Sequence, residues 1–218
     1  MCGKFTALAS WRQVVDFSQA LTAADGASDD REITLRVMGL LPVIVWDPLE
    51  KRRRVVGMRW GFPHPGDPRR PQPIHARAET IDSTRAFAEA FAGGQRGIVL
   101  ARSFNEAPES GVQHVLTPEA PIGIAMLWRR FEVPGLPAPL FACVMVTVPA
   151  NQLLRGLPTD RMPAILEPAD WPVWLGETAA GAAEAKACLK TKEGVRWTMR
   201  PEERPRRRPT VSDPGGLF

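Results

Sequence analysis

The chain has 218 residues, of which 44% are hydrophobic and 24% are charged, proportions that are typical of a globular protein. This composition excludes a disordered, collagen-like or coiled-coil chain, and the 22 prolines disfavour a bundle of long helices. A net charge of +4 permits a polyanionic partner but does not require one.

The cysteines and the apolar runs bear on the compartment. Three cysteines are an odd and sparse set, which argues against a disulfide framework, and no pair of them has the spacing of a structural zinc site. The sequence has no apolar run of about 18 residues, the length that a membrane span needs. The first five residues also lack the apolar stretch of a signal peptide. We therefore expect a cytoplasmic protein without a membrane segment.

The first predicted elements are a helix and two strands. Ser10 and Gln13 fit a capping box, and the helical spacing of the apolar residues that follow predicts a helix over residues 11–21. Short runs rich in β-branched residues predict strands over residues 40–46 and 55–60.

The next part of the chain is predicted mainly from its proline, arginine and glycine residues. Pro42 indicates an edge strand or a strand end, and the charged residues 51–54 are typical of a hairpin tip. Residues 66–73, rich in Pro, Arg and Gly, predict a loop. Thr84 can cap a helix that ends at residue 92, before two glycines.

The second half of the chain predicts four more strands, over residues 97–101, 122–128, 140–148 and 195–199. Two helices are expected before the last of these strands, a short one around Trp171 and an Ala-rich one over residues 179–189. Because strands and helices interleave irregularly, the sequence predicts the α+β class. We expect one domain over residues 1–199 and an Arg- and Pro-rich tail over residues 200–218.

Cys2 would begin the chain if Met1 were removed, and a small second side chain favours that removal. Its thiol and its α-amine would then lie on adjacent carbons, and the pKa of such an amine is far below that of lysine. Together the two nucleophiles can condense with an aldehyde, because the amine forms a Schiff base that the sulfur closes to a thiazolidine. Taken alone, Cys2 does not predict a function.

A second candidate group follows the predicted loop. His75, Arg77 and Glu79 alternate in sequence, so an extended segment would project all three to one face. The histidine could then carry a proton, the arginine could bind phosphate, and the glutamate could orient the arginine. A solvated strand with a surface ion pair is the alternative interpretation.

Three further residues could take part in chemistry or in binding. Glu106 follows a predicted strand and could be a general acid or base if it is buried. Arg161 could bind phosphate, and Trp60 could stack on a base. The alternatives are a solvated loop for the glutamate, a surface turn for the arginine and core packing for the tryptophan.

The order and spacing of these residues resemble those of the SRAP family, the SOS-response-associated peptidases or abasic-site-processing proteins. The segments that carry the resemblance are MCG at 1–3, RWGFP at 59–63, ARAET at 76–80, FNE at 104–106, AMLW at 125–128 and DRMP at 160–163. The resemblance spans most of the chain, from Cys2 to Leu175. It implies a mixed, mainly antiparallel sheet curled into a pseudo-barrel with flanking helices.

The resemblance also implies an activity. Members bind single-stranded DNA in a basic groove, and their N-terminal Cys, here Cys2, forms a thiazolidine crosslink with the aldehyde of an abasic site. Glu106 matches the glutamate that assists proton transfer, and Arg77 and Arg161 match arginines that hold the DNA backbone. His75 stands where the family usually has Asn, beside the crosslink. No metal or organic cofactor is implied, and we expect a monomer.

The chain departs from the family pattern at two positions that bear on this chemistry. Thr159 replaces a histidine that is expected to act in acid–base steps and in crosslink reversal, and Ala107 replaces a base-stacking aromatic residue. His75 is one candidate to replace the lost imidazole. Two other functions therefore stay open, a homologue that only binds single-stranded DNA and a thiol peptidase that removes Met1.

Overall fold

The computed structural model describes residues 4–7, 34–64, 66–71, 73–106, 112–157 and 159–202. The helix expected over residues 11–21 lies outside these ranges, as do Cys2, Ala107 and the chain beyond residue 202. In the described part of the chain, no helix is long and apolar enough to cross a membrane.

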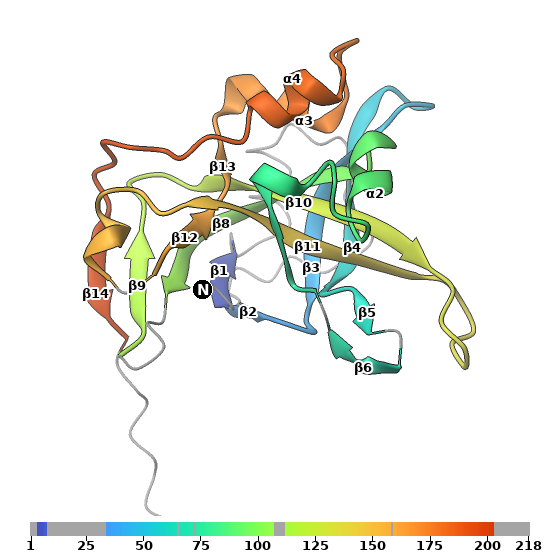
Figure 1. Ribbon diagram of the computed structural model, residues 1–218, viewed down its shortest axis with the longest axis horizontal. Coiled ribbons are helices and arrows are strands. Elements are labelled where there is room, and N and C mark those ends of the chain that lie inside the picture. The colour runs from blue at the N-terminus through green and yellow to red at the C-terminus, as the bar shows by residue number, and fades with distance from the viewer. Residues whose placement is uncertain are drawn as a thin grey trace, which may run out of the picture.

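Five long strands close into a barrel (Figure 1). They are β3 (Leu40–Asp47), β4 (Arg52–Trp60), β8 (Arg96–Glu106), β10 (Ile122–Phe131) and β11 (Leu140–Pro149). The order around the barrel is β8–β10–β11–β4–β3, and β3 returns to β8 through the pair Ile44 and Ile98. Every pair in this ring is antiparallel except β11 with β4, so the expected mixed sheet in a pseudo-barrel is confirmed.

Buried apolar residues on both faces explain why these strands have continuous apolar sequences. Residues 142–148 of β11 are all buried, because one face fills the barrel and the other is covered from outside. Trp174 belongs to this cover, and its indole N–H donates to the carbonyl oxygen of Gly97 at 2.8 Å. A side chain at Gly97 would place its Cβ only 2.5 Å from Val43, so the close approach requires glycine.

Shorter strands extend the sheet beyond the barrel. They are β1 (Lys4–Ala7), β2 (Thr34–Arg36), β7 (His75–Arg77), β9 (His114–Thr117), β12 (Arg161–Pro163), β13 (Ile165–Leu166) and β14 (Thr198–Pro201). Strands β1 and β9 lie along β8, and β14 lies along β9. Strands β7 and β12 lie along β11. The carboxyl end of β8 is thereby surrounded by other strands.

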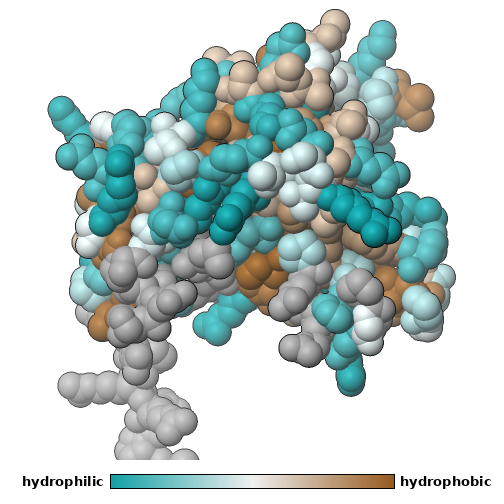
Figure 2. Space-filling model, viewed as in Figure 1, coloured by the Kyte–Doolittle hydropathy of each residue, from teal (hydrophilic) through white to brown (hydrophobic). Residues whose placement is uncertain are grey.

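The helices are short, and the one expected over residues 179–189 spans only Ala182–Ala187. They are η1 (Ala78–Thr80), α2 (Ala88–Ala92), η2 (Leu154–Gly156), η3 (Pro168–Asp170), α3 (Trp171–Leu175) and α4 (Ala182–Ala187). Figure 1 shows α3 and α4 together at one end of the molecule. The helix expected from Thr84 begins only at Ala88, because the preceding residues form turns. The visible face is mostly hydrophilic, with small hydrophobic patches (Figure 2).

Three local predictions in the first half of the chain need correction. The turn between β3 and β4 ends at Lys51, so three of the four basic residues expected at its tip, at 52–54, lie in β4. The expected loop at 66–73 contains β6 (Asp67–Pro71), which pairs with β5 (Pro63–His64). Pro42 lies in a strand paired on both sides, and it is tolerated because β3 meets β8 only at Ile44.

The last predicted strand is displaced toward the C-terminus. It runs over Thr198–Pro201 rather than over residues 195–199, and it pairs with β9. The strand therefore crosses the domain boundary that was expected at residue 199.

Candidate functional site

Glu106 is the last residue of β8, and its side chain is fully buried. The hydroxyl of Thr159 lies 3.4 Å from Glu106 Oε2 and 3.1 Å from the carbonyl oxygen of Arg161. A buried carboxyl group beside a hydroxyl donor is suited to general acid–base chemistry, since little water competes for its proton. We expected Glu106 to be a general acid or base only if it is buried, and the structure shows that it is buried.

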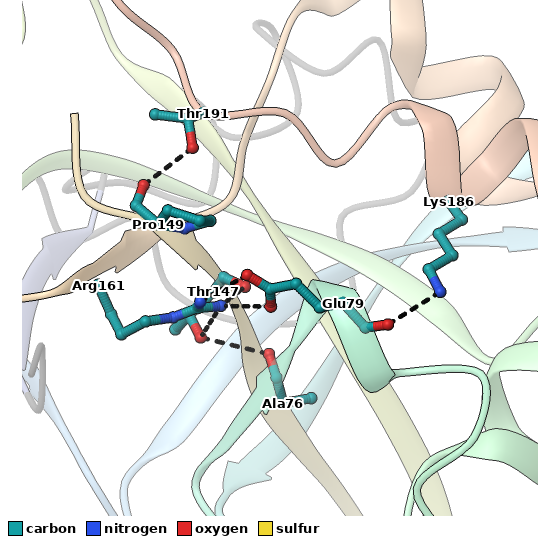
Figure 3. Close-up of polar contacts among 7 residues, drawn as sticks. All are labelled: Ala76, Glu79, Thr147, Pro149, Arg161, Lys186 and Thr191. Carbon is teal, nitrogen blue, oxygen red and sulfur yellow. Dashed lines mark hydrogen bonds and ion pairs between the residues drawn. The ribbon is translucent and has the colours of Figure 1, made fainter.

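Arg161 is held by an ion pair that connects β12 to η1 (Figure 3). Its Nη1 donates to Glu79 Oε1 at 2.6 Å, and its Nη2 donates to Glu79 Oε2 at 2.9 Å and to the carbonyl oxygen of Thr147 at 2.6 Å. Thr147 in turn donates from its hydroxyl to the carbonyl oxygen of Ala76. The hydrogen bond from Arg161 lowers the pKa of the Glu79 carboxyl.

Glu79 is therefore the partner of Arg161, and the alternation expected over residues 75–79 is wrong at its last position. The extended segment ends at Arg77, and the chain enters η1 at Ala78, which turns Glu79 toward β12. Both Nη groups of Arg161 are engaged inside the protein. They are not available to a phosphate while the ion pair is intact.

A cavity of about 580 Å³ opens beside this network. His75 and Arg77 line it from β7, where residues two apart point to the same side. Arg161, Thr147 and His64 also line it, and none of its described lining residues is acidic. Because Arg77 is exposed, its guanidinium gives this cavity a positive wall that favours an anionic ligand.

Trp60 is fully buried and offers no face to a base in this structure. Its indole N–H donates to the carbonyl oxygen of Ile74 at 3.1 Å, and its ring meets the His75 imidazole edge-on, with centroids 6.4 Å apart. The expected stacking role is therefore not supported, and the core-packing interpretation holds. Trp60 supports the imidazole that lines the cavity.

The start of the chain is tied to the same strand end as Glu106. Lys4, the first described residue, pairs with Asn105 across the β1–β8 ladder. Cys2 precedes Lys4 by two residues in the sequence and lies outside the described ranges. Cys143 and Cys188 are both buried, and burial raises the pKa of each thiol. Neither of these two thiols is suited to act as a nucleophile.

His114 is a candidate that the sequence interpretation missed. It lies directly opposite Glu106 in the antiparallel ladder of β8 and β9. Residues opposed in this way share a face of the sheet, with Cβ atoms about 5 Å apart. The side chain is half-buried, and its Nδ1 has no hydrogen-bond partner within the described ranges. Its only sequence signal is the β-branched and apolar content of β9, which was not predicted as a strand.

No group of three or more His, Cys, Asp or Glu side chains among the described residues is arranged to hold a metal ion. The absence of a cofactor stays a prediction.

A family model described as "SOS response associated peptidase (SRAP)" matches residues 1–203. The chain belongs to the SRAP family. Among curated proteins, none matches this sequence.

Solved structures share the SRAP fold at low sequence identity. A protein from Bordetella bronchiseptica has a TM-score of 0.75 at 22% identity, covering 93% of this chain and 100% of its own. A protein from Bacteroides thetaiotaomicron has a TM-score of 0.78 at 18% identity, covering 93% of this chain and 92% of its own. A phage-related protein from Bordetella bronchiseptica has a TM-score of 0.64 at 18% identity, covering 93% of this chain and 95% of its own. These likenesses establish the fold alone.

Proposed function

We propose that this SRAP protein binds single-stranded DNA and forms a thiazolidine crosslink between Cys2 and the aldehyde of an abasic site. The observation that carries the proposal is the placement of a fully buried Glu106 beside the strand pair that leads to the chain start. An N-terminal Cys that reached this buried carboxyl group would have two nucleophiles and a proton carrier together. We place this chemistry in the response to DNA damage.

The proposed reaction is balanced without an oxidant or a reductant. The α-amine of Cys2 adds to the aldehyde carbon, and loss of one water gives an imine. The Cys2 sulfur then adds to the imine carbon while its proton passes to the nitrogen, which closes the five-membered ring. In this scheme the Glu106 carboxyl gives a proton to the departing hydroxyl and is reprotonated by the N–H proton that leaves as the neutral imine forms.

We assign different tasks to the two arginines. Arg77 is exposed on the wall of the cavity, so we assign it to the DNA backbone. Arg161 is buried and paired with Glu79, and its carbonyl oxygen lies 3.1 Å from the Thr159 hydroxyl. We therefore assign Arg161 to positioning Thr159 next to Glu106, rather than to the phosphate contact that the resemblance implies.

The test is incubation with a single-stranded oligonucleotide that carries one abasic site, followed by a denaturing gel. Wild-type protein is expected to give a heat-stable, slower band, and Cys2→Ala is expected to give none. Cys188→Ala is the matched control, because that thiol is buried and outside the site, and it should crosslink like wild type. A wild-type protein that gives no such band would overturn the proposal.

Binding without crosslinking is the second candidate, and Thr159 favours it. Thr159 stands beside Glu106 and cannot titrate near neutral pH, so a proton-transfer group expected there is missing. This alternative predicts salt-sensitive binding of single-stranded DNA with no covalent product on the same gel. The gel thus decides between the two functions.

A further inference from the structure

A polar groove of about 420 Å³ lies on the other side of β8 from Glu106. Asn105 and Ser103 line it, and neighbouring residues in a strand point to opposite faces of the sheet. Glu106 therefore faces the candidate active site, while Asn105 faces this second groove. We call it the β8–β14 groove, because β14 forms its other wall through Arg200 and Pro201.

A bulge in β8 turns an arginine toward the β8–β14 groove. In the ladder with β1, Thr6 pairs with Ser103 but Ala7 pairs with Ala101, so Arg102 is an extra residue in β8. An inserted residue of this kind redirects side chains locally. As a result, Arg102 and Ser103 both line the groove although they are neighbours in a strand.

A second arginine, from β14, lines the same groove. Arg200 is exposed, lines the groove, and makes no ion pair with any described residue. Glu202 is the one acidic residue among the described lining, so the two guanidinium groups leave a net positive charge. Guanidinium groups hold phosphate oxygens through paired N–H donors, which makes a phosphate-bearing ligand the natural match.

The floor of the groove holds a polar group that needs a partner. Asn105 is 3% exposed, and its Nδ2 has no hydrogen-bond partner among the described residues. A buried donor without an acceptor destabilises the fold, so such groups are rare unless a ligand satisfies them. Four residues with hydroxyl side chains also line the groove, Thr6, Thr34, Ser103 and Thr117. This lining fits the sugar and base-edge atoms of one nucleotide better than it fits an apolar ligand.

We propose that the β8–β14 groove is a second subsite that holds one nucleotide of single-stranded DNA, with Arg102 and Arg200 at its phosphate and Asn105 at its sugar or base. That the ligand is single-stranded DNA rests on the proposed function, but the subsite does not depend on crosslinking. DNA contacts on both faces of β8 would hold the DNA next to Glu106, at the carboxyl end of β8.

The test measures binding of undamaged oligothymidylate of about 15 nucleotides at several salt concentrations. Arg200→Glu is expected to weaken binding at least tenfold and to reduce the slope of log affinity against log salt by about one. Arg130→Glu is the matched control, since Arg130 is exposed on the far hairpin and outside the groove, and it should change neither quantity. Equal affinities for wild type and Arg200→Glu would overturn the proposal.

Asn105→Leu separates the ligand role from a structural one. The leucine is similar in volume and removes the unsatisfied donor, so the melting temperature without ligand should stay or rise. Thymidine monophosphate should raise the melting temperature of wild type but not of Asn105→Leu. Protection of wild type by inorganic phosphate equal to that by thymidine monophosphate would overturn the nucleotide assignment. Crosslinking is measured in a separate assay. If crosslinking fails but the binding results are as expected, the proposed function is wrong and the subsite proposal holds.

Discussion

Arg161 and Glu79 form a bidentate ion pair that joins β12 to η1 at the wall of the cavity, with N–O distances of 2.6 and 2.9 Å. The arginine side chain is 10% exposed and the glutamate side chain 47% exposed. Removing the glutamate would thus leave a buried guanidinium without its main partner. This asymmetry makes Glu79 a sensitive position for stability.

Glu79→Gln is expected to lower the free energy of unfolding at pH 7 by about 1–3 kcal/mol, because Arg161 loses its charged acceptor. The pKa of Glu79 is held below its ordinary value of 4.5, mainly by the hydrogen bond from Arg161. A carboxyl group with a lowered pKa stabilises the fold above its ordinary value, and this contribution disappears as the pH falls through the lowered pKa. Denaturant unfolding should thus show the difference at pH 7 and a smaller one below pH 4.5.

Glu89→Gln provides the control for that measurement. Glu89 pairs with Arg129 on the surface, and its side chain is 82% exposed, so its removal should cost less than about 1 kcal/mol. A difference for Glu79→Gln that persists unchanged into acid would contradict the proposed role of the ion pair.

Glu106→Gln is expected to slow crosslinking by about 10²–10⁴-fold, because the amide cannot carry a proton. The substitution preserves the shape of the side chain and its hydrogen-bonding capacity toward Thr159. Affinity for undamaged single-stranded DNA should therefore stay within twofold to threefold of wild type (about 0.5 kcal/mol). Rate and affinity are measured separately on the same preparation, and a crosslinking rate like that of wild type would remove Glu106 from the mechanism.

His114→Gln is expected to slow crosslinking, because an amide cannot pass a proton to or from the Glu106 carboxyl. This expectation rests on the register position of His114 directly opposite Glu106. His75→Gln should instead reduce the yield at low DNA concentration, since His75 lines the cavity. A crosslinking rate in His114→Gln equal to that of wild type would show that this imidazole does not act with Glu106.

Thr159→His is expected to speed the release of DNA from the purified crosslink. The new imidazole would stand where a hydroxyl now lies 3.4 Å from Glu106 Oε2, within reach for proton transfer. Thr159→Asn, which adds a polar side chain that cannot titrate near neutral pH, is the control. Release rates are followed by gel over time, and equal rates for both variants would count against a role of this position in reversal.

The barrel strands could be predicted because their signal is local. Residues 122–128 and 140–148 are continuous apolar runs, and both became central strands buried on two faces. Shorter elements could not be predicted in the same way. The strands β6 and β9 are mixed in polarity, so they depend on pairing with a neighbouring strand more than on their own sequence, and β14 was predicted only with displaced bounds.

The candidate site could be predicted in its residue types but not in its partners. Glu106 was found at a strand end, and the structure adds that it is fully buried. Glu79 was expected beside Arg77, but the onset of η1 at Ala78 turned it to Arg161. His114 joins Glu106 only through the antiparallel register, which no spacing in the sequence reveals.

The most direct test of the central claim is the intact mass of the product of wild-type protein and an abasic single-stranded oligonucleotide. We predict the mass of the protein without Met1 plus that of the oligonucleotide, less one water. A product that retains Met1, or an absence of any covalent product, would contradict a thiazolidine formed at Cys2.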